Sequence, residues 1–338
     1  MGTKSFLPAS PISNAMETVV ANLGIDVAKK KFDVALLKNE KYKSKSFDNK
    51  ASGFIALLAW MKQREPGEIH VCLEATGGYG DQLAKFLFEN GYTVSVVNPS
   101  RVKAFGEAEL LRNKNDKIDA KLLARFCNKM KPAAWQPDPP EIEHLRMLGR
   151  RRDVLIAMRT QETNRLGNPD KSVNESIEKV IAFLNQEIEQ ITQSIKDHIN
   201  SNDDLKKKRD LLDSIKGVGD VVIEAILSET NGFARFDRIE QVVAYMGLSP
   251  KEKTSGSSVK GKSLLCKIGS ARLRKVLYMP ALSATRSNPF VRDLYLRLTA
   301  KSKNGMVVAC ACMKKLVHIM FGVLKSGKPF DPAYGKTS

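Results

Sequence analysis

The sequence predicts an α/β domain followed by a mainly helical region, and three observations support this fold class. Between residues 19 and 130, short apolar runs typical of strands alternate with amphipathic segments typical of helices. Between residues 141 and 200, apolar residues recur at three- and four-residue spacing over long stretches. From residue 209 onward, helical stretches surround a segment rich in Gly, Ser and Lys. The chain therefore divides into a loose arm (1–18), an α/β domain (19–130), a linker with long helices (131–208) and a C-terminal domain (209–338).

The α/β domain is expected to contain three meandering strands followed by alternating helices and strands. Strands are predicted at 19–28, 31–37, 43–47, 69–73 and 92–97, and the polar third strand suits a sheet edge. Helices are predicted at 52–62, 80–89, 101–111 and 116–128. Ser52 is available as the N-cap of the first helix.

The remainder of the chain is expected to be helical. The prolines between residues 131 and 140 indicate a linker or a segment that wraps around a domain edge. Long helices at 141–163 and 174–200 are predicted to form an antiparallel hairpin or coiled coil. Gly217-Val-Gly219 lies between helical stretches, as in a helix-hairpin-helix, whose turn amides can hold a DNA phosphate; an ordinary helix corner explains it equally well. Further helices are predicted at 271–286 and 307–324.

The composition is strongly basic, with 55 Lys and Arg against 37 Asp and Glu in 338 residues and a formal charge of +18. Such a charge favours a polyanionic partner, above all nucleic acid. The five cysteines show no zinc-ligand spacing with the histidines, which favours a reduced, cytoplasmic protein. No apolar run is expected to reach the roughly 18 residues that span a membrane. Residues 1–18 do not resemble a signal peptide.

Four carboxylates are candidates for a catalytic metal site. Asp26 and Glu74 lie within or at the end of apolar strand-like runs, where a charge is costly unless it is paired or binds metal. Asp116 and Asp119 are spaced i, i+3 on a helix-like segment and share one face, although a solvated helix face is the alternative. Mg²⁺ and Mn²⁺ prefer oxygen ligands and can flank a scissile phosphate. We therefore predict that these four acids bind Mg²⁺ or Mn²⁺, and that Asp33 is a structural or a surface residue.

A serine lies within the most basic segment of the chain. Thr254-Ser255-Gly256 is followed by Ser257 and Ser258, and a serine on a Gly-containing loop can approach a phosphate closely. Nearby cations would stabilise charge on that phosphate. A flexible Ser-Gly loop is the simpler explanation from these residues alone. The predicted nucleic-acid-binding cations of this segment are Lys251, Lys253, Lys260, Lys262, Lys267, Arg272, Arg274 and Lys275.

Short motifs in a fixed order carry a family resemblance. The first half contains Gly24-Ile-Asp-Val-Ala-Lys29, Leu73-Glu-Ala-Thr-Gly-Gly78, Val97-Asn-Pro-Ser-Arg-Val102 and Asn115-Asp-Lys-Ile-Asp-Ala120. The second half contains Ile215-Lys-Gly-Val-Gly219, Tyr245-Met-Gly-Leu-Ser-Pro250, Thr254-Ser-Gly256 and Ile268-Gly-Ser-Ala-Arg-Leu-Arg274. Together they resemble the DEDD, RuvC-like insertion-sequence transposases, a family that includes the Piv invertase and recombinases guided by a bridge RNA.

The resemblance implies a fold and a function. It implies a RuvC-like, RNase H-like catalytic domain, with Asp26, Glu74, Asp116 and Asp119 as its metal-binding tetrad. It also implies a C-terminal transposase domain in which Ser255, with Ser257 and Ser258 as alternates, forms a phosphoserine link to DNA. The expected activity is transposition or site-specific recombination of double-stranded donor and target DNA, guided by a bridge RNA. Homodimers that pair into tetramers are expected.

Three alternatives differ in the residues that they need. A Piv-like invertase would act without a guide RNA. A metal-dependent, structure-specific nuclease would need the four acids but not Ser255. A non-catalytic nucleic-acid-binding protein would tolerate the loss of Asp26 or Glu74, and the resemblance argues against it.

Overall fold

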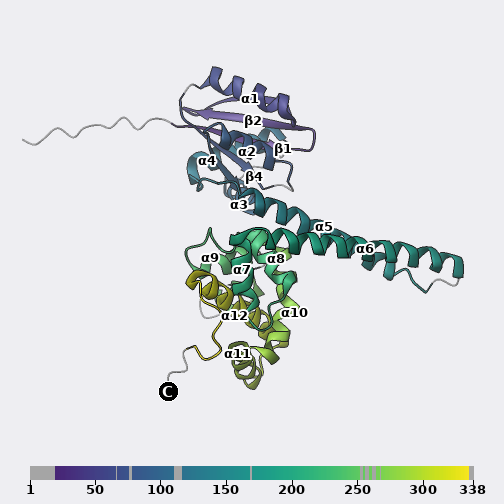
Figure 1. Ribbon diagram of the computed structural model, residues 1–338. Coiled ribbons are helices and arrows are strands. Elements are labelled where there is room, and N and C mark those ends of the chain that lie inside the picture. The colour runs from purple at the N-terminus through teal and green to yellow at the C-terminus, as the bar shows by residue number, and fades with distance from the viewer. Residues whose placement is uncertain are drawn as a thin grey trace, which may run out of the picture. The chain divides into compact units, whose positions relative to one another are not determined.

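The computed structural model divides into two compact units, one ending at Pro137 and the other beginning at Asp138. It describes residues 20–65, 67–75, 78–109, 116–167, 170–251, 254–255, 259–260, 264–266 and 268–334. The first unit combines a sheet with helices, and the second is mostly helical (Figure 1). The mixed α/β class with additional helices, predicted from the sequence, is confirmed.

Within the described part of the first unit, five strands form a single mixed sheet. They are β1 (Ala21–Val27), β2 (Lys31–Lys38), β3 (Lys41–Asp48), β4 (Ile69–Glu74) and β5 (Thr93–Val97). Their order across the sheet is β3-β2-β1-β4-β5. The first three strands form an antiparallel meander, whereas β4 is parallel to β1 and β5 is parallel to β4. The polar strand β3 occupies an edge, as predicted.

Helices cover both faces of this sheet. They are α1 (Ala51–Arg64), α2 (Asp81–Glu89), α3 (Pro99–Ala108) and α4 (Asp116–Met130). Because side chains alternate along a strand, Leu23 and Ile25 of β1 point to one face, where they join a core with residues of α1 and α2. Asn22, Gly24 and Asp26 point to the opposite face, against which α4 packs. The acidic side chain of β1 is therefore on the α4 side.

Eight helices form most of the second unit over the residues that the structure describes. They are α5 (Pro140–Thr163), α6 (Lys171–Asn200), α7 (Asp203–Asp213), α8 (Asp220–Thr230), α9 (Ile239–Tyr245), α10 (Ala271–Ser287), α11 (Pro289–Ala300) and α12 (Gly305–Ser326). Two short strand pairs, β6 (Pro250–Lys251) with β9 (Leu264–Leu265) and β7 (Thr254–Ser255) with β8 (Val259–Lys260), lie between α9 and α10 in the sequence.

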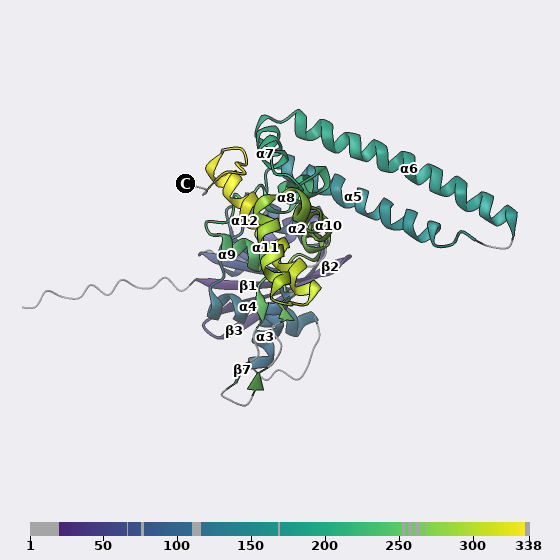
Figure 2. The ribbon, with the colours of Figure 1, turned by 90° about the horizontal axis from the view of Figure 1, so that it is seen from below.

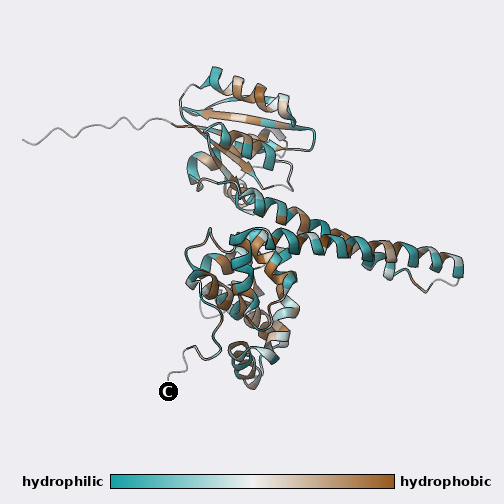
Figure 3. Cartoon of the chain, viewed as in Figure 1, coloured by the Kyte–Doolittle hydropathy of each residue, from teal (hydrophilic) through white to brown (hydrophobic). Residues whose placement is uncertain are grey.

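The predicted hairpin of long helices is confirmed. His198 of α6 contacts the backbone oxygen of Glu141 at 2.8 Å near one end, and Arg159 donates to Asn185 at 3.1 Å nearer the other end, so α5 and α6 are antiparallel. Both views show the hairpin extending away from the other helices of this unit (Figures 1 and 2). Apolar residues recur along both helices among hydrophilic ones, as the alternating colours of Figure 3 show.

Helix α12 has the length and mean hydropathy of a membrane span, although Lys314 and Lys315 interrupt its apolar residues, so that it contains no continuous apolar run of about 18 residues. Over the described residues, this helix alone reaches the necessary length and hydropathy. It packs within the second unit, where Cys312, Leu316, Val317 and Met320 are buried in the main core. Its apolar composition is explained by contacts with several helices of the same unit.

Two local features differ from the sequence prediction. α1 begins after Lys50, whose side chain makes no capping hydrogen bond, and Ser52 lies inside the helix and does not cap it. Helices α9 and α11 were not predicted. The signal for α11 was present in Asn288-Pro289, because Asn288 accepts hydrogen bonds from Phe290 and Val291 and proline occupies the first helical position.

Candidate active site

Three of the four predicted acids lie around one pocket in the first unit. The pocket has a volume of about 440 Å³ and is lined by Asp26 of β1, Glu74 of β4 and Asp119 of α4. The predicted fourth acid, Asp116, begins α4 and is described by its backbone alone. Sequence positions 26, 74 and 119 are thus brought together from three separate elements.

The approach of α4 to β1 explains how Asp26 meets the start of that helix. Asn22 donates to Asn128 at 3.4 Å, and Gly24 lies against the backbone of Ala120 and Ala124. The strand β1 and the helix α4 therefore run in opposite directions where they pack together. Asp26, two residues beyond Gly24 on the same face, is placed beside the first turns of α4.

Glu74 reaches the same face through β4. Two residues earlier, Cys72 is buried beside Cys127 of α4, whose thiol donates to the backbone oxygen of His70 at 3.6 Å. The neighbouring Cys72 thiol, together with burial, raises the pKa of the Cys127 thiol above its ordinary value. Because Cys72 and Glu74 share a face of β4, Glu74 lies toward the N-terminal half of α4, where Asp119 is found.

Helix α3 supplies the remaining side of the pocket. Asn98 caps this helix by accepting a hydrogen bond from the backbone of Ser100 at 2.8 Å. Ser100, Lys103 and Glu107 all line the pocket. Lys103 and Glu107 approach each other at 3.9 Å across one helical turn, and both are exposed. The pocket therefore has polar and charged walls on a surface that solvent reaches.

Asp33 lies directly beside Asp26 on the neighbouring strand. The two residues are register partners in the antiparallel β1–β2 pair, and partners of this kind point to the same face. Asp33 is only 4% exposed; it accepts a hydrogen bond from Ser46 and forms an ion pair with Lys31 at 3.2 Å. These partners compensate its burial, so a structural role describes Asp33, and the surface position that was the other expectation does not.

The donor atoms around the pocket suit a hard divalent cation. Asp26, Glu74 and Asp119 offer carboxylate oxygens, and the described lining contains neither His nor Cys. Oxygen donors of this kind are the ligands that Mg²⁺ and Mn²⁺ prefer. Within the part of the chain whose side chains are described, no three His, Cys, Asp or Glu residues form a ready metal-binding group. The metal site stays a prediction.

The serine segment, residues 246–270, connects α9 to α10. Its two ends are joined by backbone hydrogen bonds from Cys266 to Ser249 at 2.9 Å and from Ser270 to Tyr245 at 2.8 Å. Gly269 permits this closure, because a Cβ there would lie 2.3 Å from the Tyr245 carbonyl oxygen. Between these joined ends, β6 pairs with β9 and β7 pairs with β8.

Ser255 lies in β7, opposite Val259 of β8. Lys251 and Lys260 also lie on these short strands, and the structure describes their backbone. The other predicted residues of this segment lie outside the described residues; they are Lys253, Ser257, Ser258, Lys262 and Lys267. The catalytic role of the serine and the phosphate contacts of these lysines stay predictions.

Arg272 is held by acids of the second unit. Its guanidinium contacts Asp153 at 2.6 Å, Glu224 at 3.0 Å and Glu229 at 3.5 Å. Burial by itself lowers the pKa of Arg272, but the carboxylates of Glu224 and Asp153 outweigh this effect and raise that pKa above its ordinary value. Sequence reasoning missed this network, which joins α5, α8 and α10.

Glu224 is the centre of this network. It is fully buried, it accepts a hydrogen bond from Ser228 at 3.0 Å, and Arg152 contacts it at 2.6 Å. Gly149 makes room for it, since a Cβ there would lie 2.0 Å from the Glu224 Oε1 atom. The guanidinium groups of Arg152 on α5 and Arg272 on α10 both contact this buried carboxylate on α8. The network therefore connects the helical hairpin to the other helices of the unit.

The two remaining predicted cations of α10 differ in their contacts. Arg274 donates to the backbone oxygen of Met246 at 2.9 Å, which fastens α10 to the end of α9. Lys275 is exposed on the same helix. A phosphate-binding role stays a prediction for both, and Lys275 is the more accessible of the two.

The Gly-Val-Gly turn connects α7 to α8, as the predicted helix–turn–helix order requires. Gly217 has a φ of +97°, and a Cβ at this position would lie 2.8 Å from the Cβ of Ala284 in α10. Gly219 precedes α8 and has open space where a Cβ would be. Close packing against α10 therefore explains why position 217 is a glycine. Gly219, which has no side chain, leaves the N-terminus of α8 accessible.

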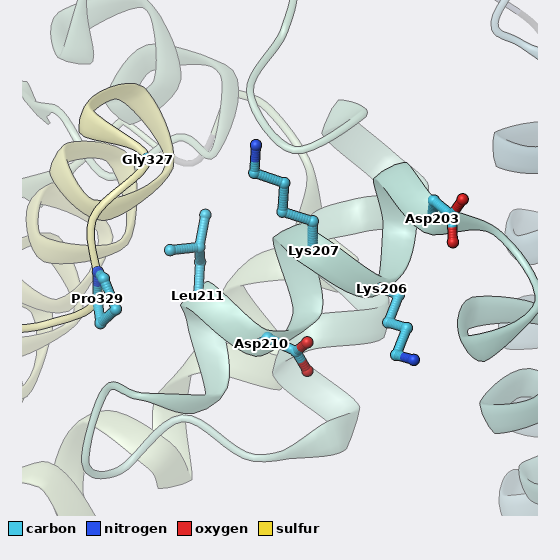
Figure 4. Close-up of a pocket in the computed structure, with 7 residues that line it drawn as sticks. All are labelled: Asp203, Lys206, Lys207, Asp210, Leu211, Gly327 and Pro329. Atoms are coloured by element: carbon cyan, nitrogen blue, oxygen red, sulfur yellow. The ribbon is translucent and has the colours of Figure 1, made fainter.

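Another pocket of the second unit lies beside α7 and the end of α12 (Figure 4). Lys206 and Lys207 line it together with Asp203 and Asp210, and the two lysine side chains point in different directions in Figure 4. Lys208, next to them, pairs with Asp204. Because two acids line the pocket together with the two lysines, the pocket offers no concentrated positive charge for a phosphate.

Comparison with known proteins gives a consistent family assignment. Residues 23–168 match a family model described as a transposase of the DEDD, IS110 type, and residues 209–296 match one described as a transposase of the IS116/IS110/IS902 family. The pilin gene-inverting protein of Moraxella lacunata is 29% identical over 312 residues, which cover 91% of this chain and 97% of that protein. The corresponding protein of Moraxella bovis matches over the same shares. The transposase for insertion sequence element IS1111A of Coxiella burnetii is 22% identical, covering 72% of this chain and 74% of that protein.

Proposed function

The chain belongs to the IS110/IS116/IS902 family of transposases, and we propose that it recombines DNA through a phosphoserine link, using its carboxylate pocket and Ser255. The convergence of Asp26, Glu74 and Asp119 on a single pocket supports this proposal most directly. These residues lie far apart in the sequence and on three elements. An ordinary solvated helix face would not explain why Asp119 meets two acids from adjacent strands.

The sheet order supports an RNase H-like, RuvC-like assignment for the first unit. An antiparallel meander of three strands continues into β4 and β5, which are parallel to β1. Asp26 lies on the central strand of this sheet, and Glu74 ends the next strand. Acids at the carboxyl ends of parallel strands are well placed to act on a ligand at the sheet edge.

The four acids Asp26, Glu74, Asp116 and Asp119 would hold Mg²⁺ or Mn²⁺. When bound, such an ion would stabilise negative charge on a phosphate oxygen and help to orient the phosphate. Lys103, at the pocket rim, adds a positive charge that attracts the DNA backbone.

Ser255 would provide the nucleophile. Its Oγ atom forms a bond to phosphorus, the bond between phosphorus and a deoxyribose oxygen breaks, and the departing oxygen takes up the proton that the serine gives up. The number of phosphodiester links is unchanged, so the reverse reaction can rejoin the strand to a different partner. The backbone hydrogen bond from Cys266 to Ser249 joins the two sides of the serine segment, which supports a defined position for this nucleophile.

A structured bridge RNA would select the donor and target DNA. The formal charge of +18 favours polyanionic partners, and a guide RNA would be one of them. The alternative, a Piv-like invertase without a guide, is favoured by the match to the pilin gene-inverting protein over nearly its whole length. Both readings use the same acids and serine.

A homodimer, pairing into a tetramer, would assemble through the helical hairpin. Large apolar side chains are exposed along α5 and α6, among them Val154, Met158, Val180 and Phe183. Phe183 is 59% exposed. The projection of the hairpin from the other helices of its unit leaves these side chains accessible to a second chain (Figure 2).

The decisive test separates the acids from the serine. The protein is expressed beside its native flanking DNA, the copurifying RNA is sequenced, and covalent protein–DNA adducts are measured on DNA from the element ends. Asp26→Asn and Ser255→Ala should abolish adducts while DNA binding is kept. Asp48→Asn, an exposed acid of the same domain, should leave the adducts unchanged.

Each alternative predicts a different result. Nicked DNA without an adduct, still formed by Ser255→Ala, would identify a metal-dependent nuclease. Adducts retained in Ser255→Ala but lost in Ser257→Ala or Ser258→Ala would move the nucleophile. A discrete RNA encoded in the flank would support guidance, and the recovery of heterogeneous RNA alone would favour the unguided invertase.

A further inference from the structure

A separate cavity between α10 and α11 combines positive charge with an aromatic ring. Its volume is about 570 Å³, within the range of about 300–1,000 Å³ that is common for small-ligand sites. Arg286, on α10, and Arg292 and Tyr295, on α11, are three of its lining residues. Leu282, Thr285 and Leu296 complete the lining.

The corner between these helices has a fixed geometry. Asn288 is fully buried, ends α10 through a backbone hydrogen bond to Ala284 at 2.9 Å, and caps α11 by accepting from Phe290 and Val291. Its side chain also donates to the backbone oxygen of Lys216 at 3.4 Å. The cavity is therefore held open by the backbone and does not depend on a mobile loop.

The two arginines are available for an anion. Among the described residues, the guanidinium group of neither Arg286 nor Arg292 has a hydrogen-bond or ion-pair partner, and both side chains are exposed. The cavity lining contains no Asp or Glu. Arg272 on the same helix α10, by contrast, contacts three carboxylates. Two unneutralised guanidinium groups beside one cavity favour phosphate.

The remaining lining suits a nucleobase. Tyr295 is 36% exposed and Leu296 is 54% exposed, although both are large and carry apolar surface. Aromatic side chains stack on unpaired bases, and leucine side chains provide an apolar wall. The hydroxyl of Thr285 donates to the Leu282 backbone oxygen at 2.7 Å, so its oxygen can accept a hydrogen bond from a base.

We propose that this cavity binds one unpaired nucleotide of a nucleic-acid strand, with the base against Tyr295 and the flanking phosphates beside Arg286 and Arg292. The inference rests on the proposed function for the class of polymer, and it adds a binding site away from the carboxylate pocket and Ser255. A base-paired duplex hides its base faces by stacking, so the site selects a flipped-out or single-stranded nucleotide. The same chemistry would accept a loop of a guide RNA or a displaced DNA strand.

The test measures binding of short oligo(U), oligo(dT) and duplex DNA to the full-length protein by fluorescence anisotropy. Tyr295→Leu should weaken single-strand binding about 5- to 100-fold, whereas Tyr295→Phe should keep it. The double variant Arg286→Ala, Arg292→Ala should reduce the steepness of the logarithmic salt dependence for single strands by about 1.4. Arg297→Ala, on the same helix but outside the cavity lining, and Tyr334→Leu, at an exposed tyrosine elsewhere, are the matched controls and should change neither quantity.

Photocrosslinking of 5-iodouracil-substituted strands maps the contact. A crosslink at Tyr295 whose yield is higher for RNA supports a guide-RNA loop as the occupant, and a higher yield for DNA supports a displaced DNA strand. Equal single-strand affinity in the original protein and in Tyr295→Leu, or crosslinks only outside α10 and α11, would overturn the proposal. Because binding is measured without strand transfer, the result does not depend on the catalytic roles of Asp26 or Ser255.

Discussion

Gly24 of β1 and Ala120 of α4 lie so close together that a Cβ at position 24 would be 2.1 Å from the Ala120 carbonyl oxygen. The same Cβ would lie 2.3 Å from the Ala124 backbone nitrogen. Both neighbours are backbone atoms and cannot move aside without moving α4. This contact sets the distance between the strand that carries Asp26 and the helix that carries Asp119.

Gly24→Ala should therefore disturb the site without altering any of its acids. We expect the added methyl group to push α4 outward, to reduce the free energy of unfolding by about 1–3 kcal/mol and to lower strand-cleavage activity more than DNA binding. Urea unfolding and an adduct assay measure the two effects. Gly80→Ala is the control, because the nearest atom to a Cβ there would be a side-chain methyl of Leu73 at 3.0 Å, and the nearest backbone atom would lie at 3.9 Å. Full activity in Gly24→Ala would show that α4 does not position the acids.

Arg272 provides a prediction about stability. Arg272→Met should lower the free energy of unfolding by about 3–5 kcal/mol, because it leaves Glu224 buried with one fewer cation. Lys275→Met, three residues further along α10 and exposed, should leave unfolding unchanged while weakening DNA binding. Chemical denaturation and binding titrations separate the two variants. An Arg272→Met protein of normal stability that binds DNA poorly would instead assign Arg272 to phosphate binding.

The contrast between these two residues shows how far the sequence could be interpreted. A run of cations between 247 and 275 predicts affinity for phosphate, but charge alone does not say which side chain turns inward. The Arg272 side chain contacts Asp153 and Glu224, which lie 119 and 48 residues away in the sequence. Such contacts depend on how α5, α8 and α10 pack, and no local pattern encodes that packing.

The three acids that line the carboxylate pocket could be singled out from the sequence, for a physical reason. Asp26 and Glu74 stand out because each interrupts or ends an apolar strand, and Asp119 stands out as one of a helical i, i+3 pair. The strands around them were also predictable from their apolar runs. Their order in the sheet was not, since it depends on the pairing of β1 with both β2 and β4. Helix α9 was missed because it has only seven residues, whereas α11 follows α10 directly and its start signal, Asn288-Pro289, was overlooked.

A pH dependence of stability is expected from His70. Its Nε2 atom lies 2.8 Å from the Ser95 hydroxyl, which donates to the backbone oxygen of Pro132 or Ala133, so Nε2 is the donor to Ser95. Burial lowers the pKa of His70 below its ordinary value of 6.5. Above that value the ring is neutral in both states and makes no difference. Below it, the unfolded chain takes up a proton that the folded chain resists, so stability falls as the pH falls.

His70→Gln should flatten this part of the stability profile. Urea unfolding between about pH 7 and about pH 5 measures the slope, and the variant should lose less stability than the original protein over this interval. His144→Gln is the control, since its ring lies on α5 in the other unit. Identical slopes for the original protein and His70→Gln would mean that other groups cause the acid sensitivity.

The exposed apolar residues of the helical hairpin predict how the protein assembles. Val180 and Phe183 lie on α6 and are 42% and 59% exposed, whereas Ile177 and Leu184 of the same helix are buried. Replacing Val180 and Phe183 by serine removes apolar surface available to a second chain and leaves the buried seam with α5 unchanged. We expect the dimer dissociation constant to rise at least about tenfold, with helix content unchanged. Sedimentation velocity over a range of protein concentrations measures this constant.

The matched variant with serine at Lys179 and Gln186, both exposed and polar, should assemble normally. If the Val180 and Phe183 variant assembles as tightly as the original protein, the dimer interface lies outside this face of the hairpin.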